Sequence, residues 1–356
     1  MQKTIFRLNS IDKKPHLRYN ICMKKIFIIT IIFLAAAITL VGCEPYGTEG
    51  LVYVKEYDEE FSRYYVVVSG GGKTDYTAVT IPQSRVGAYV EVIDSHAFMN
   101  CRDLTQVKIP QFVTIIAAQA FKNCVSLKQI ALPPRLAIIS SEAFYGCSSL
   151  EGITIPDSVI SINSWAFQQC TGLKTVFLPA DMQRINDRMF SGCAALDYIP
   201  LPAALKMIGA GAFENCINLS DVKLPMELKS IDYMAFSGCT SIEKIELPSS
   251  LVRTNKDKTD EMLKDVFIGV DESAFEGCTS LTEVVVNEDI EIADGAFKGC
   301  PIKKLTLLGS GVTNFAAFDF DVDNLDGLVI NVSPAALEEY RAHPEWGVLT
   351  EYISVI

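Results

Sequence analysis

Histidine is scarce in this sequence, and the motifs that usually mark a catalytic or metal site are missing. The chain has three histidines in 356 residues. No CxxC or HxxxH pair is present, so a zinc site of ordinary spacing is not expected. The sequence also lacks a GxSxG elbow, a phosphate-binding loop and an HExxH motif. We therefore predict that the protein is not an enzyme and binds no cofactor or metal. The less favoured alternative is an enzyme whose two catalytic acids are distant in the sequence and meet in the fold.

Positive charge is also in short supply. The chain has 31 Lys and Arg against 43 Asp and Glu, a formal net charge of −12. The first 42 residues hold seven of the basic residues and one acid, so the rest carries 24 basic and 42 acidic residues, a net charge of −18. Such an acidic body repels phosphate backbones and anionic lipid head groups, so nucleic-acid binding is not expected.

Residues 1–42 are predicted to be an export signal rather than part of the fold. Lysines 24 and 25 follow Met23, a candidate initiator, and precede the apolar stretch IFIITIIFLAAAIT and then LVGC. The apolar run of about 17 residues is marginal for crossing a bilayer, which leaves a transmembrane anchor as the alternative. The ending LVGC resembles a bacterial lipoprotein signal, which implies that Cys43 is lipidated and anchors the chain.

A 23-residue repeat occupies most of the remaining chain. Nine phenylalanines are each followed three residues later by a cysteine, in the unit CxxLxxIxIPxxVxxIxxxAFxx. The phenylalanines are Phe98, Phe121, Phe144, Phe167, Phe190, Phe213, Phe236, Phe275 and Phe297. Self-similarity at a fixed short period is the mark of a solenoid.

The chemistry of one repeat predicts its shape. Ile153 and Ile155 alternate with polar residues, which is typical of a short strand, and Pro156 ends it. A unit of this size cannot bury its own apolar face, so neighbouring coils must stack, about 4.8 Å apart at a parallel sheet. Val159 and Ile162 turn the chain back on the opposite side. The sequence does not distinguish between three conformations for that side: a short helix, a 3₁₀ turn or a second short strand.

This pattern resembles the BspA-like (Treponema-type) leucine-rich repeat family. The resemblance implies a leucine-rich-repeat solenoid of about nine coils, with one parallel strand per coil on a concave face and a cap at each end. It assigns 43–75 to an N-terminal linker and cap, 76–307 to the repeats and 308–356 to a C-terminal cap. An insertion at about 252–267 is read as a solvated loop or as a contact element.

The repeated cysteines are predicted to be structural. Equivalent residues of adjacent coils lie within the Cα distance range of a disulfide, and an exported chain permits one. Side chains in such a ladder are parallel, however, and nine cysteines cannot all pair. We therefore expect a column of buried free thiols.

A candidate binding face lies on the outward strand positions. Phe177, Tyr198 and Pro200 are predicted to cluster on adjacent coils, with Thr175 and Lys223 beside them. Exposed aromatic residues on a polar face are candidate hot spots for binding. Scattered surface apolar residues are the ordinary alternative.

The family resemblance implies a surface lipoprotein of a Bacteroidota-type bacterium, for which adhesion is the commonest role. We expect an exported chain, lipid-anchored in the cell envelope at the outer membrane and exposed to the outside. Its partner would be a host or bacterial surface protein or a glycan, and it would touch the membrane only through the anchor. Glycan capture for nutrient uptake and a structural role in the envelope are the alternatives.

Overall fold

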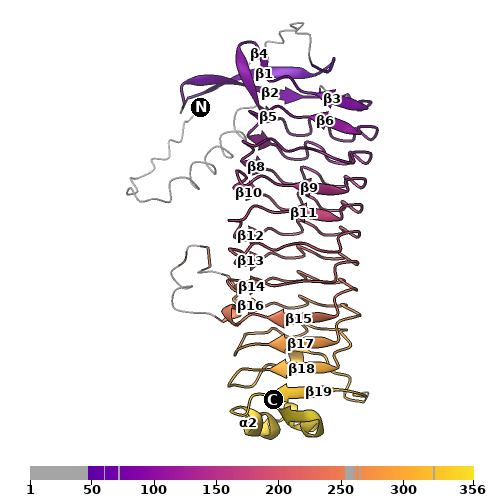
Figure 1. Ribbon diagram of the computed structural model, residues 1–356, viewed down its shortest axis with the longest axis vertical. Helices are drawn as coiled ribbons and strands as arrows, with labels where there is room; N and C mark the ends of the chain where they lie inside the picture. The colour runs from indigo at the N-terminus through magenta and orange to yellow at the C-terminus, as the bar shows by residue number, and fades with distance from the viewer. Residues whose placement is uncertain are drawn as a thin grey trace, which may run out of the picture. The chain divides into compact units, whose positions relative to one another are not determined.

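The computed structural model describes residues 47–59, 61–70, 73–252, 260, 262–263, 266–323 and 325–356. Cys43 and the predicted signal lie outside the described residues. The repeats stack coil upon coil into one parallel β-solenoid (Figure 1). No helix in the described ranges has the length and apolar character needed to cross a membrane.

The first line of strands comes from the LxxIxI half of several repeats and continues in two strands beyond the last repeat. Each strand pairs in parallel with the equivalent strand of the adjacent coil. Thr175, for example, lies opposite Gly152, and Val284 lies opposite Leu305. The strands of this line are β3 (Ala78–Thr80), β6 (Gln106–Lys108), β9 (Gly152–Thr154), β11 (Thr175–Phe177), β15 (Lys244–Leu247), β17 (Glu283–Val286), β18 (Lys304–Leu307), β19 (Val329–Val332) and β20 (Ile353–Val355).

A second line of short strands runs down the other side of the stack, in addition to the predicted strand line on the first side. These strands come from the VxxI half of the repeat, where the β-branched residues favour extended backbone. They are β2 (Arg63–Ser69), β5 (Ala88–Ile93), β7 (Ile115–Ile116), β8 (Ile138–Ile139), β10 (Ser161–Ile162), β12 (Arg184–Ile185), β13 (Met207–Ile208), β14 (Ser230–Ile231) and β16 (Gly269–Val270). Of the three possibilities for this side, the second strand is correct.

Both ends of the stack depart from the repeat. At the N-terminal end, β1 (Val52–Asp58) pairs antiparallel with β2, and β4 (Ser84–Arg85) pairs antiparallel with β5. At the C-terminal end, β19 and β20 extend the parallel sheet beyond the last recognisable repeat. The stack therefore has about 12 turns instead of the predicted nine.

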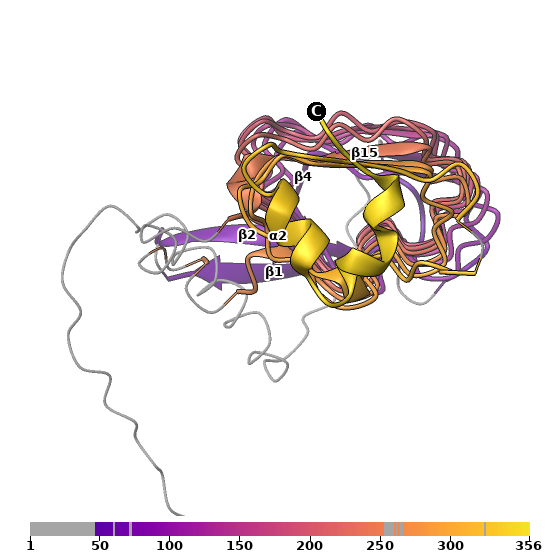
Figure 2. The ribbon, with the colours of Figure 1, turned by 90° about the horizontal axis from the view of Figure 1, so that it is seen from below.

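Among the described residues, short helical segments lie just before the insertion and at the C-terminal end. They are η1 (Ser249–Leu251), η3 (Phe315–Ala317), α2 (Leu337–Ala342) and η4 (Trp346–Tyr352). Figure 2 looks along the stack and shows α2 and η4 lying over its end. Trp346 in this group is fully buried, so the helices cover core that would otherwise face solvent.

A ladder of phenylalanines forms the centre of the core. Ten rings, from Phe98 to Phe318, stack at centroid separations between 5.1 and 5.7 Å. Phe318 continues the ladder one coil beyond Phe297, although no cysteine accompanies it. All ten rings are almost completely buried, so the aromatic column joins ten successive coils.

The cysteine column lies beside this ladder and consists of free thiols, as expected. Eight of the nine repeat cysteines are buried and Cys300, the last, is partly buried. Each thiol from Cys124 onward donates to the carbonyl of the phenylalanine 25 to 42 residues earlier, one coil away; for example, Cys147 Sγ lies 3.2 Å from Phe121 O. The cysteine thus adds a hydrogen bond between coils to its role as a small apolar side chain.

Each coil also turns through left-handed backbone next to the cysteine. The residue before the cysteine has φ near +60° to +74° in every repeat. Asparagine, glycine and glutamine occupy these positions: Asn100, Asn123, Gly146, Gln169, Gly192, Asn215, Gly238, Gly277 and Gly299. Glycine and asparagine tolerate this conformation best, which explains their recurrence before the cysteine.

Candidate functional site

The predicted binding face lies on the exposed side of the first strand line. Phe177 is 55% exposed and Tyr198 is 44% exposed, and Thr175, Pro200 and Lys223 are also exposed. Their neighbours in sequence point the other way, since Val176 is 1% and Ile199 is 3% exposed. The alternation expected of a half-buried strand therefore places all five residues on the solvent side.

Thr175 and Phe177 are presented by strand β11. This strand pairs with β9, with Thr175 opposite Gly152 and Phe177 opposite Thr154. A Cβ on Gly152 would come within 2.6 Å of Thr175 Oγ1, so the glycine leaves room for the threonine side chain. The phenylalanine ring is thus carried by a short but well-registered strand.

The sheet is interrupted on the next coil, at Pro200. Proline has no N–H to give to a ladder and is confined to edges and breaks of a sheet. Accordingly, β11 ends its two-stranded sheet, and Tyr198 takes part only in an isolated parallel bridge with Asp221. The aromatic residues lie at this break, where the backbone is less regular than in the rest of the stack.

Charge on this face is arranged around Asp221. Lys223 Nζ lies 3.1 Å from Asp221 Oδ2, and both side chains are exposed. Hydrogen bonding to Asp221 is the main reason that the pKa of Lys223 is raised, and the charge of Tyr198 contributes. The ammonium therefore stays protonated beside the tyrosine. Together these residues offer two aromatic faces, a hydroxyl and a cation to a partner.

The repeated thiols and the metal-ligating side chains of the described residues are the groups that bear on chemistry. In the described part of the chain, no group of three His, Cys, Asp or Glu side chains is placed to hold a metal ion. Desolvation raises the pKa of the buried thiols, to about 12 for Cys170 and Cys216. Only the thiolate is a good nucleophile, so these cysteines are unreactive in the folded chain.

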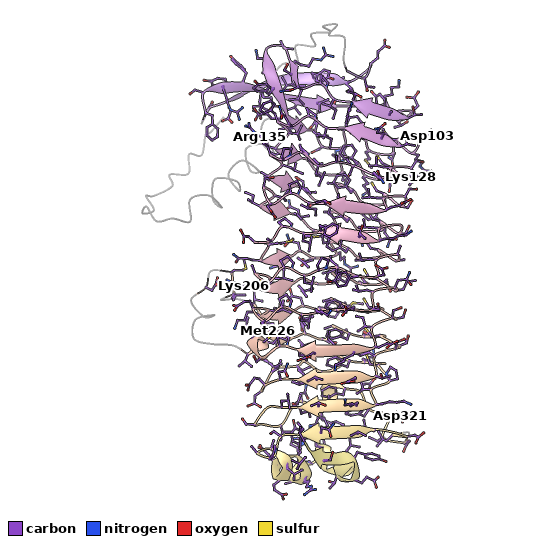
Figure 3. The ribbon with its side chains drawn as sticks, in the orientation of Figure 1. Asp103, Lys128, Arg135, Lys206, Met226 and Asp321 are labelled. Atoms are coloured by element: carbon purple, nitrogen blue, oxygen red, sulfur yellow. The ribbon has the colours of Figure 1, made fainter. Side chains whose placement is uncertain are left out.

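The insertion packs on the second strand line where it can be described. Leu263 and Ile268 are 1% exposed and form a small apolar cluster with Met207, separate from the main core. Lys206 Nζ also lies 3.1 Å from Asp260 Oδ2. Figure 3 shows Lys206 at the edge of the stack. Asp260 and Leu263, within the insertion, therefore contact the solenoid, and the solvated-loop interpretation does not hold for Leu263.

Two surface features were missed from the sequence. Tyr57 and Tyr64 form a cross-strand pair on the β1–β2 hairpin, with ring centroids 4.9 Å apart and both side chains about half exposed. A cleft also opens beside Asp289 and Asn314. The alternating run RYYVVVS at residues 63–69 could have indicated the strand of the hairpin. Nothing in the sequence indicates the cleft, because it arises from a break between coils.

The comparisons with known proteins agree with this fold. The model of the BspA type leucine rich repeat region matches in six copies over residues 91–220, 183–258 and 254–340. The chain therefore belongs to the BspA-type leucine-rich repeat family. Among curated proteins, none matches this sequence.

Solved leucine-rich repeat structures are similar to this chain at low identity. A leucine-rich repeat protein from Bacteroides ovatus is 24% identical with a TM-score of 0.56, over 82% of this chain and 76% of that one. The leucine-rich repeat protein of T. pallidum is 26% identical with a TM-score of 0.41, over 48% and 88%. A leucine-rich cell surface protein from Faecalibacterium prausnitzii is 19% identical with a TM-score of 0.32, over 74% and 95%. The first of these supports the fold.

Proposed function

We propose that this protein is an exported, lipid-anchored surface protein that binds a protein or glycan partner without a chemical step. The binding face is the group Thr175, Phe177, Tyr198, Pro200 and Lys223, and Cys43 is the anchor. The observation that carries the proposal is the exposure of Phe177 and Tyr198 on adjacent coils of a tightly packed solenoid. Rigid aromatic side chains bind at a low cost in conformational entropy, which is why they recur as hot spots.

Adhesion to another surface is the preferred form of this function. The anchor would hold the solenoid in the outer membrane, facing outward, and the stacked coils would display the face away from the lipid. The net charge of −18 for residues 43–356 keeps the body away from anionic lipid head groups. Capture of a glycan is the second candidate, because the exposed rings of Phe177 and Tyr198 can stack on sugar rings.

The test compares cells that display the wild-type protein with cells that display Phe177→Ala/Tyr198→Ala. We expect the variant to lose about tenfold or more in binding to immobilised matrix proteins, since a hot-spot side chain contributes more than about 1.4 kcal/mol. Trp165→Ala is the matched control, because Trp165 is a 40% exposed aromatic residue on the turn side.

Each component of the proposal has its own outcome. Unchanged binding by Phe177→Ala/Tyr198→Ala would remove this face from the proposal. A signal on a glycan array that the same variant abolishes would favour glycan capture over adhesion to protein. Cys43→Ser should release the protein from the membrane fraction, and its retention there would contradict the lipid anchor.

A further inference from the structure

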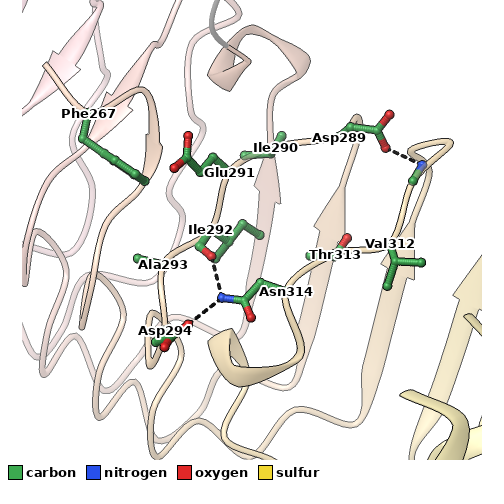
Figure 4. A pocket seen from close by; sticks show the side chains of 11 residues that line it. Phe267, Asp289, Ile290, Glu291, Ile292, Ala293, Asp294, Val312, Thr313 and Asn314 are labelled. Carbon is green, nitrogen blue, oxygen red and sulfur yellow. Dashed lines mark hydrogen bonds between the residues drawn. The ribbon is translucent and has the colours of Figure 1, made fainter. Parts of the chain in front are cut away.

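A second surface feature lies where the second strand line ends. An open cleft of ≈ 620 Å³ lies between the coil that carries Asp289–Asp294 and the following coil, with Gly311–Asn314 on its other side. Phe267, from the end of the insertion, completes the lining (Figure 4). The cleft is far in sequence from the face around Phe177 and has a different composition.

The cleft lies where backbone pairing of the second strand line stops, although bonds such as Phe297 N–H to Ala317 O still join the two coils elsewhere. Earlier coils are joined by bonds such as Gly209 N–H to Ile185 O, and the last bridge of the line is Val270↔Ile292. The next residue in register, Thr313, is held by the C-terminal cap instead. Its N–H donates to Tyr340 Oη at 2.9 Å, and Trp346 Nε1 donates to its carbonyl at 2.7 Å.

A side chain replaces one of the missing ladder bonds. Asn314 Nδ2 donates to Ile292 O at 3.0 Å and to Asp294 Oδ1 at 2.8 Å (Figure 4). No backbone hydrogen bond in the described chain joins residues 290–292 to Val312. The carbonyl oxygens of Ile290 and Val312 are therefore left as acceptors without a protein partner among the described residues.

The described residues of the lining carry negative charge. Asp289, Glu291 and Asp294 line the cleft, and the described lining includes no lysine or arginine. Asp289 accepts from Gly311 N–H and from the Ser310 hydroxyl, both at 2.8 Å, which lowers its carboxyl pKa and keeps it ionised. Glu291 has no partner in the described chain and projects on the side of Phe267 (Figure 4).

We propose that this cleft binds an arginine side chain of a basic peptide segment on a partner protein. A guanidinium has five N–H donors in one plane, which matches carboxylates and carbonyl oxygens that are spread along a cleft. Its flat face can stack on the ring of Phe267. A metal ion fits less well, because the described carboxylates of the cleft do not converge on one point.

The test measures binding of a fluorescein-labelled peptide with one central arginine among glycines to the full chain, by fluorescence anisotropy. A twin peptide with citrulline in place of arginine has the same shape and no charge. We expect the arginine peptide to bind and the citrulline peptide to bind at least about tenfold more weakly, because charge-assisted hydrogen bonds are lost.

Variants locate the binding on the chain. Glu291→Gln should weaken arginine-peptide binding about tenfold, whereas Glu227→Gln, an exposed acid elsewhere on the stack, should not change it. Phe267→Leu keeps an apolar wall and removes the ring, so a smaller loss is expected from it. Equal binding of the two peptides, unchanged binding by Glu291→Gln, or no binding at all would overturn the proposal.

This inference does not depend on the function proposed for the strand face. Phe177→Ala/Tyr198→Ala should bind the arginine peptide as well as the wild type does. If the arginine peptide does not bind, the binding face around Phe177 stays a valid proposal. If Phe177→Ala/Tyr198→Ala does not affect adhesion, the proposal for the cleft stays valid.

Discussion

At the scale of single residues, the recurring cysteine is a hydrogen-bond donor in the core rather than a reactive group. The carbonyl of Phe121 accepts from Cys124 N–H in its own coil and from the thiol of Cys147 in the next coil. A buried carbonyl can accept two such bonds, and the thiol is small enough to fit beside the stacked rings. This geometry requires the cysteine to stay reduced and protonated.

The first prediction concerns the reactivity of these thiols. In the folded protein at pH 8, iodoacetamide should leave the eight buried repeat cysteines unlabelled, because burial raises the pKa of the thiols, to about 11 for Cys101 and about 12 for Cys170. Partly buried Cys300 should be labelled first. After unfolding without reductant all nine should react, as read by peptide mass spectrometry. Fewer would indicate disulfides and contradict the structure.

The sequence predicted which side chains recur in the core, but it did not predict the backbone conformation next to them. The column of buried cysteines, with Cys147 as one member, follows from the sequence because the cysteine recurs at the same position of every repeat. The left-handed conformation of residues such as Asn123 and Gly146 was missed, although asparagine and glycine before the cysteine are its signal. The preference for left-handed backbone at this position is visible only when the same position is compared across all repeats.

At the scale of elements, ion pairs join strands of the first line across coils. Glu283 on β17 accepts from Lys244 on β15 at 2.9 Å and from Lys304 on β18 at 3.1 Å. The three residues share one register position in successive coils, so the carboxylate lies between two ammonium groups. The hydrogen bond to Lys244 and the bond to Lys304 lower the pKa of Glu283.

The second prediction is a pH-dependent effect of Glu283→Gln. Because its pKa is lower folded than unfolded, the carboxylate stabilises the fold above its unfolded pKa, and that contribution disappears as the pH falls through the folded pKa. Glu283→Gln should lower the free energy of unfolding at pH 7 by less than about 1 kcal/mol, since the lysines are half exposed. The difference should vanish at pH 3.

Thermal unfolding of the wild type and the variant at both pH values checks this expectation. Glu243→Gln is the matched control, because Glu243 is an exposed acid on the same coil as Lys244. A loss at pH 3 as large as that at pH 7 would show that the glutamate acts through packing and not through charge.

At the scale of the whole molecule, stability depends on contacts between neighbouring coils and on the closure of the ends. Trp346 closes the C-terminal end. It is fully buried, contacts Phe318 and Tyr340 edge to face at 5.9 and 5.3 Å, and donates a hydrogen bond to Thr313 O. In a stack of this kind, loss of an end exposes the next coil.

The third prediction is that Trp346→Ala unfolds the stack from its C-terminal end. Truncation of a buried tryptophan costs about 3–5 kcal/mol. Hydrogen exchange should speed up first in β18, β19 and β20, while the coils around Phe144 keep their protection. Trp165→Ala, at a 40% exposed site, should change neither the stability nor the exchange pattern appreciably. A uniform loss of protection would mean that the solenoid unfolds as one cooperative unit.

The sequence by itself determined the repeat, the apolar core and the outward direction of Phe177 and Tyr198, because these follow from periodicity within each coil. Only the tertiary structure decided the second strand line, the extra turns beyond the nine repeats and the cleft beside Glu291. Those features depend on which backbone groups of adjacent coils meet. The coil that contains Thr313 lacks the repeat motif. Its position in the stack depends on the hydrogen bonds of Thr313 with Tyr340 and Trp346.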